Sequence, residues 1–274
     1  MNKRIYAIIC FFSIASIAQA QKLPTTQKNS LFAPADIKVD GKTSEWNNKF
    51  QAYNNNTNFF YTISNDDKNL YLIIQVTDPV IINKIVSAGI TFVINKSGKK
   101  EEESAVAITY PLFDIKDRPM IDVKNTPKID KDSPASVLKA DSFMADNNKR
   151  LKDKSKYIKV TGAKDLDTLV SVYNHEGIKA TELFDNRMIY TYELAVDLKH
   201  LELSESGDGK FAYEIKSNGA TLDNLNGVSF GPPKPGSRLK FGSIIIGPGA
   251  MPPSAIPVMT STTNFWGEYT LAKK

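Results

Sequence analysis

The amino-acid sequence predicts an all-β protein, an antiparallel β-sandwich with a partly helical insertion. Two observations favour this fold class: many short apolar segments alternate with a period of two, and turn residues separate them. A third is a clear β-hairpin between Tyr61 and Asp78, in which a polar turn at residues 65–69 joins two strands.

The longer strand of this hairpin carries apolar residues on both faces. On one face they alternate at period two: Leu70, Leu72, Ile74 and Val76. Tyr71 and Ile73 make the other face partly apolar as well. We therefore expect a central strand that is covered on both sides.

Other segments show the same alternation along the chain. We expect strands at 36–41, 89–95, 105–112, 157–161, 168–173, 178–183, 189–198, 211–216 and 264–271. One helical turn is expected near 81–86. Residues 114–156 are rich in lysine, aspartate and proline and read as an insertion with a helix at 135–152, whereas residues 231–262, rich in proline and glycine, read as an irregular loop.

The first residues have the pattern of a signal peptide. Residues 1–20 combine a positive start, an apolar run too short for the roughly 20 residues that span a bilayer, and a small-residue cleavage site between Ala20 and Gln21. We expect export to the periplasm, the cell surface or the medium. Residues 21–35 then read as a flexible leader and 36–274 as a single domain without a membrane span.

Composition restricts the chemistry of the exported chain. Cleavage leaves 274 − 20 = 254 residues and removes Cys10, the only cysteine. The net charge falls from +5 to +3, since only Lys3 and Arg4 leave. So small an excess, spread along the chain, gives no reason to expect a nucleic-acid partner.

Three sequence motifs resemble one family. Residues 37–46 contain Asp-Gly and Glu-Trp pairs, residues 61–78 contain an Asn-Asp turn followed by Leu-Tyr-Leu, and Tyr192 opens a Tyr-Glu-Leu strand. Together with residues 265–271, they resemble the family 9 carbohydrate-binding modules and their DOMON-like relatives. Asp197 stands where that family usually has proline. The resemblance implies a secreted β-sandwich without naming its ligand.

Aromatic side chains are the first candidates for a sugar site. The resemblance implies that such residues stack on sugar rings. We expect Trp46 and Trp266 to belong to the core, because both lie inside motifs that build the fold. The candidate ligand-binding residues, which flank an Asn-rich loop and a turn, are Tyr53, Phe59, Tyr173 and His175.

A metal or haem has weaker support. Calcium is implied by the resemblance, and Asp66, Asp67 and Asp78 offer oxygen donors near turns, yet none fits a calcium-loop spacing. Ordinary turn aspartates are the favoured interpretation. Haem would need axial ligands such as His175 or His200, which we expect at the surface and which no spacing pairs with methionine.

These observations favour a non-catalytic carbohydrate-binding module. Catalysis has little support, because no known nucleophile or metal-protease motif occurs in the sequence. The main alternative is an envelope protein that kept the fold and binds a protein partner. A haem-binding electron-transfer domain is a third hypothesis. Gathering of Tyr53, Phe59 and Tyr173 on one exposed surface would favour sugar binding, and scattering would favour the protein partner.

Overall fold

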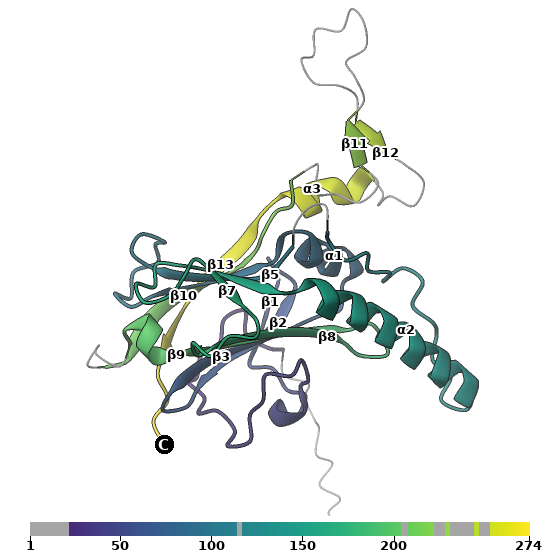
Figure 1. Cartoon of the computed structure of the whole chain (residues 1–274). Coiled ribbons are helices and arrows are strands. Elements are labelled where there is room, and N and C mark those ends of the chain that lie inside the picture. Colours follow the sequence, from purple (N-terminus) through teal and green to yellow (C-terminus); the bar gives the residue numbers. More distant parts are fainter. Residues whose placement is uncertain (1–21, 114–116, 204–207, 222–227, 231–243, 247–252) are drawn as a thin grey trace, which may run out of the picture.

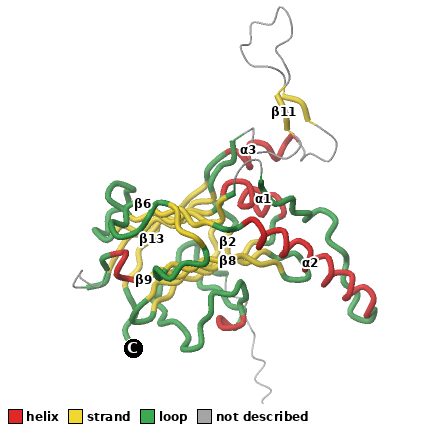
Figure 2. The backbone as a smooth tube through the Cα atoms, viewed as in Figure 1, coloured by secondary structure: helices red, strands yellow, loops and turns green. Residues whose placement is uncertain are grey.

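The chain folds into two stacked antiparallel sheets (Figure 1). The computed structural model describes residues 22–113, 117–203, 208–221, 228–230, 244–246 and 253–274. The strands form two layers, and the longer helices lie at one side of them (Figure 2). The predicted antiparallel β-sandwich is confirmed.

The first sheet has five strands in the order β1-β2-β3-β9-β8. Their bounds are β1 Ala52–Asn54, β2 Phe59–Asn65, β3 Asn69–Val76, β8 Ile178–Phe184 and β9 Tyr190–Asp197. The second sheet has six strands in the order β13-β10-β4-β5-β6-β7. Their bounds are β4 Ile90–Asn95, β5 Val106–Leu112, β6 Tyr157–Thr161, β7 Leu169–Ser171, β10 Lys210–Ser217 and β13 Thr263–Thr270. A separate pair joins β11 (Val228–Phe230) to β12 (Ile244–Ile246).

The predicted hairpin is confirmed as β2 and β3, and β3 is the middle strand of its sheet. Its inward residues, among them Leu72 and Ile74, join the main core between the sheets. Tyr71 and Ile73 point the other way and pack with Trp46 in a second apolar cluster. The strand is therefore covered on both faces, as its sequence predicts.

Two tyrosines join the sheets across the core. The hydroxyls of Tyr61 on β2 and Tyr213 on β10 lie 3.0 Å apart, and the backbone N–H of Gln27 donates to Tyr61 at 2.9 Å. A Cβ atom at Gly267 of β13 would lie 2.2 Å from the Tyr213 ring. Glycine at this position is what lets the ring pack against the neighbouring strand.

Helices occupy the connections between strands. Helix α1 (Pro79–Ala88) is longer than the single turn expected, because Asp78 caps its N-terminus and accepts from the N–H groups of Val80 and Ile81. Helix α2 (Pro134–Lys154) confirms the helix predicted in the insertion and packs along β8. The remaining helices within the described ranges are short: η1 (Ser44–Trp46), η2 (Leu198–Leu201), η4 (Pro253–Ala255) and α3 (Ile256–Thr260). No helix in these ranges has the length and apolar character that crossing a bilayer needs.

Two segments in the N-terminal part of the chain differ from expectation. Residues 36–41 form no strand; Ile37 and Val39 instead pack on the outer face of the five-stranded sheet. Residues 22–35 do not form a separate leader, because they lie along β2, where Gln27 and Ile63 exchange hydrogen bonds of 2.7 Å. The apolar alternation of residues 36–41 therefore reflects packing on a sheet and not strand pairing.

Other predictions fall partly or wholly on undescribed residues. The signal peptide 1–20 and its cleavage site lie outside the described residues. Of the predicted irregular loop 231–262, residues 231–243 and 247–252 are likewise outside them. The remainder includes β12, η4 and α3, so that part of the segment is more regular than its proline content suggests.

Candidate functional site

A cleft of about 590 Å³ opens between helix α2 and edge strand β8. Its lining comes from α2 and β8, together with Ser155, which follows α2, Tyr110 of β5, residues 172–174, and residues 39 and 40. We call it the α2–β8 cleft. A volume of this size falls in the range of small-molecule sites, about 300–1,000 Å³.

The floor of the cleft contains an unpaired stretch of sheet edge. In an antiparallel pair, successive residues direct their backbone groups alternately towards the partner strand and away from it. Asn174 donates to the outward C=O of Ile178 at 2.8 Å, and Asn148 bonds both the N–H and the C=O of Phe184, at 2.7 and 2.9 Å.

Two residues lie between these asparagine contacts. By the same alternation, Ala180 and Glu182 direct their N–H and C=O groups away from β9, and no other group in the described ranges bonds them. The cleft therefore offers backbone donors and acceptors side by side, which is how many small-molecule sites recognise hydroxyl groups.

A buried carboxyl group lies behind this edge. Glu182 is 6 % exposed, and its two oxygens accept hydrogen bonds from the hydroxyls of Ser155 and Tyr190. Burial raises the pKa of Glu182 to about 7, although both hydrogen bonds oppose the shift. Near neutral pH the group is thus divided between its neutral and its charged form.

Tyr173 stands at the mouth of the cleft with 65 % of its surface exposed. The Lys156 ammonium lies 5.4 Å from the ring centroid and donates to the tyrosine hydroxyl at 3.2 Å. These contacts orient the ring but leave a face free for an apolar surface such as that of a pyranose.

Positive charge lines the cleft. Lys149 and Lys152 of α2 and Lys179 of β8 contribute to its wall, and none of them forms an ion pair within the described part of the chain. Besides Glu182, the carboxylate in the lining is that of Asp40, which is half-buried and lies 3.6 Å from the Lys42 ammonium. The lysines thus outnumber the charged carboxylates at this site.

The other aromatic candidates lie elsewhere. Tyr53 is half-buried on β1, where its ring lies 4.5 Å from that of Phe60 and its hydroxyl contacts Asn58. The expectation that Phe59 is exposed is wrong: it is fully buried in the core, because it faces inward on β2. β1 and β8 are the opposite edges of the five-stranded sheet, about 19 Å apart across its width. Tyr53 lies on β1, whereas Tyr173 lies in the turn between β7 and β8 and lines the cleft beside β8. The three aromatics do not gather on one surface.

The two tryptophans also differ from each other. Trp46 is 6 % exposed, as expected of a core residue. The expectation for Trp266 is wrong, because Phe265, Gly267 and Tyr269 take the inward positions of β13 and leave Trp266 half-exposed on the outer face.

The histidines have separate roles. His175 is exposed in the turn next to the cleft without lining it. His200 is 4 % exposed rather than at the surface: its Nδ1 lies 2.7 Å from the Asp165 carboxylate and its Nε2 lies 2.5 Å from the Glu176 carbonyl. With both ring nitrogens engaged, His200 has none left for iron.

The candidate metal ligands do not converge. Asp66 accepts from the N–H groups of Lys68 and Asn69 at 2.8 and 2.6 Å and from the Tyr71 hydroxyl at 2.6 Å, so it organises the β2–β3 turn. Asp67 is exposed in the same turn. Asp78 caps α1 at the far end of β3, roughly 25 Å away along the strand. In the described ranges no three His, Cys, Asp or Glu residues cluster in a way that could hold a metal ion.

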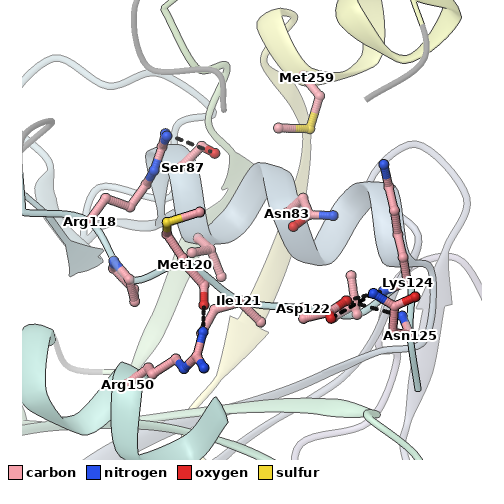
Figure 3. A pocket seen from close by; sticks show the side chains of 13 residues that line it. Asn83, Ser87, Arg118, Met120, Ile121, Asp122, Lys124, Asn125, Arg150 and Met259 are labelled. Atoms are coloured by element: carbon pink, nitrogen blue, oxygen red, sulfur yellow. Dashed lines mark hydrogen bonds between the residues drawn. The ribbon is translucent and has the colours of Figure 1, made fainter. Parts of the chain in front are cut away.

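Figure 3 shows a second cavity, of about 440 Å³, beside α1 and α3. Its polar groups are largely used in holding residues 118–125 in place. The Arg150 guanidinium donates to the Met120 carbonyl at 3.0 Å, and the Asp122 carboxylate accepts from the Asn125 amide at 2.8 Å. We therefore take the α2–β8 cleft, with its unused backbone groups, as the better candidate site.

Sequence reasoning identified Tyr173 but not Glu182 or the three lysines. One signal was present: Glu182 occupies an inward position of a strand whose other inward residues are Ile178, Ala180 and Phe184. A carboxyl group on an apolar face marks a site of interest. The lysines gave no signal, because only the packing of α2 against β8 brings them together.

Comparisons with known proteins define no family for this chain. No family model, no curated protein and no solved structure matches it. The class of protein shown by the structure is that of an antiparallel β-sandwich, and its function has to be argued from the site.

Proposed function

We propose that the chain is an exported, non-catalytic carbohydrate-binding module and that a short saccharide binds in the α2–β8 cleft. The observation that carries the proposal is the position of Tyr173, an exposed ring at the mouth of a cleft with unpaired backbone groups. An aromatic face and hydrogen-bonding groups close together suit a sugar, whose C–H faces are apolar and whose edges carry hydroxyls.

The scattering of the aromatic residues limits the kind of site. A flat platform of several rings, such as one that binds a crystalline polysaccharide, is not formed by Tyr53, Phe59 and Tyr173. By the criterion drawn from the sequence, this scattering favours a protein partner. The cleft is what keeps a saccharide as our first proposal, because it provides polar groups in a confined space.

A protein-interaction domain of the cell envelope is the second candidate. It is supported by Leu138 on α2 and Met120 in the preceding segment, large apolar side chains that are each 69 % exposed. Such residues are typical of docking surfaces when they gather in a patch. Export rests on the signal-peptide pattern of residues 1–20 and places either candidate in the periplasm, at the cell surface or outside the cell.

A glycan-array screen of the purified protein tests the first candidate, once with calcium and once with a chelator. We expect saturable binding to one class of saccharide, lost in Tyr173→Ala and retained in Tyr53→Ala, which removes a tyrosine at the opposite edge of the sheet. Circular dichroism confirms that both variants fold. No binding by the folded protein to any glycan would refute the proposal and direct the search to protein partners.

A further inference from the structure

The charge of the α2–β8 cleft bears on the kind of saccharide it accepts. Lys149 and Lys152 are three residues apart on α2 and so lie on the same face of the helix, while Lys179 comes from β8. In the described part of the chain, none of the three has a carboxylate partner. The cleft therefore has cationic groups on two sides that are available to a ligand.

The carboxyl groups at the cleft do not cancel this charge. Glu182 is buried behind the strand edge, and both of its oxygens already accept hydrogen bonds from Ser155 and Tyr190. Asp40 lies close to Lys42. Since ammonium groups without partners attract anions and repel cations, an anionic ligand is favoured over a neutral or cationic one.

The same edge restricts the shape of the ligand. A peptide that added itself to β8 as another strand would need several consecutive edge residues with free backbone groups. Only Ala180 and Glu182, about 7 Å apart along the strand, lie between the residues whose outward groups Asn174 and Asn148 occupy. A compact ligand with several hydroxyls suits two such residues better than an extended peptide does.

We propose that the saccharide bound in the α2–β8 cleft is an acidic one, whose carboxylate or sulfate group is held by Lys149, Lys152 and Lys179 while its hydroxyls bond the edge of β8 at Ala180 and Glu182. This inference rests on the proposed function and adds the ligand class to it. Lysine contributes a point charge without a planar fork, so the shared chemistry of carboxylate and sulfate is what the site recognises.

Calorimetric titration with matched oligosaccharides tests the inference. The probes are oligogalacturonate, a sulfated galactose oligomer, the uncharged galactose oligomer of the same length, and an acidic peptide. We expect an acidic oligosaccharide to bind about tenfold or more tightly than the neutral one, with affinity that falls as ionic strength rises.

Charge-removing variants assign the effect to the cleft. In Lys149→Gln/Lys152→Gln, affinity for the acidic oligosaccharide should fall about tenfold, and binding of the neutral one should not change. The control is Lys128→Gln/Lys139→Gln, which removes the same charge from the same segment outside the cleft and should bind like the parent.

The other outcomes separate the two proposals. Equal affinity for charged and neutral oligosaccharides would overturn the acidic ligand and leave the carbohydrate-binding function standing. Binding of no saccharide would overturn both. An acidic peptide that binds as tightly as the acidic oligosaccharides, or loss of binding in the control variant, would show that the cleft lacks the proposed selectivity.

Discussion

The indole N–H of Trp46 donates a hydrogen bond to the Glu193 carboxylate at 3.3 Å. The other oxygen of the same carboxylate accepts from the backbone N–H groups of Asp40 and Gly41, at 2.8 and 2.7 Å. Glu193 is 3 % exposed on β9. One buried side chain therefore ties residues 37–46 to the outer face of the five-stranded sheet, and it brings together two motifs that are far apart in the sequence.

Replacement of Glu193 should release this segment. Glu193→Ala leaves three donors without their acceptor, and we expect the free energy of unfolding to fall by about 3 kcal/mol or more in urea denaturation. Glu193→Gln keeps one oxygen for the two backbone N–H groups and should lose about 1 kcal/mol. Glu45→Ala, a change at a half-buried residue of the same segment, is the control. A loss as small as that of the control would show that Glu193 does not hold the segment on the sheet.

The free energy of unfolding should fall as pH rises, because the pKa of Glu182 is higher in the folded protein than in the unfolded chain. Its pKa is about 7 in the folded protein, through burial, against 4.5 ordinarily, so between these values the folded state holds a proton that the unfolded state has lost. This contribution is fully present below pH 4.5 and lost as pH rises through 7.

The variant Glu182→Gln removes this contribution. The free energy of unfolding of the variant, relative to that of the parent, should rise by on the order of 3 kcal/mol as pH increases from 4.5 to 8. Urea denaturation at several pH values measures it. Burial raises the pKa of Glu193 to about 7 as well, so the variant keeps part of the slope. An unchanged pH profile would contradict the assignment.

Two neighbouring tyrosines of β9 should respond differently to loss of the hydroxyl. Tyr192 is fully buried, and its hydroxyl has no partner among the described residues, whereas that of Tyr190 donates to Glu182. Tyr192→Phe should therefore leave the free energy of unfolding unchanged or raise it by about 1 kcal/mol, while Tyr190→Phe should lower it by about 1–3 kcal/mol. Equal losses in thermal unfolding would mean that the Tyr192 hydroxyl does have a partner.

A buried lysine on α1 should limit stability at neutral pH. Lys84 is fully buried, its ammonium donates to the Thr263 hydroxyl at 3.1 Å, and burial lowers its pKa to about 8. The unfolded state therefore binds the proton more tightly than the folded state does, and stability rises with pH between 8 and the ordinary value of 10.5.

Lys84→Met should stabilise the protein at pH 7 by about 1–3 kcal/mol, because it removes the cost of burying a charge. The gain should shrink as pH approaches 10.5. Lys139→Met, an exposed change on α2, should show neither effect. If Lys84→Met were less stable than the parent at pH 7, the Lys84 ammonium would have to have an ionic partner.

Much of the strand arrangement could be predicted from local pattern. The segments around β3, β6 and β9 alternate strongly, because each strand packs at least one face against the core, and their positions agree with the structure. For residues 36–41 the same alternation predicts a strand, and this prediction is wrong. Ile37 and Val39 alternate because they pack on a sheet surface, and a pattern of burial does not reveal whether the backbone is paired.

The sequence by itself determined the fold class, most strands, helix α2 and Tyr173 as an exposed aromatic, since these follow from local periodicity and turn chemistry. Only the tertiary structure decided that Phe59 is buried, that Glu193 joins two distant motifs, and that Tyr173, Glu182 and the lysines of α2 meet at one cleft. The physical reason is that a site depends on which strand forms the edge and which helix packs beside it. Such contacts join residues distant in the sequence, and no local pattern records them.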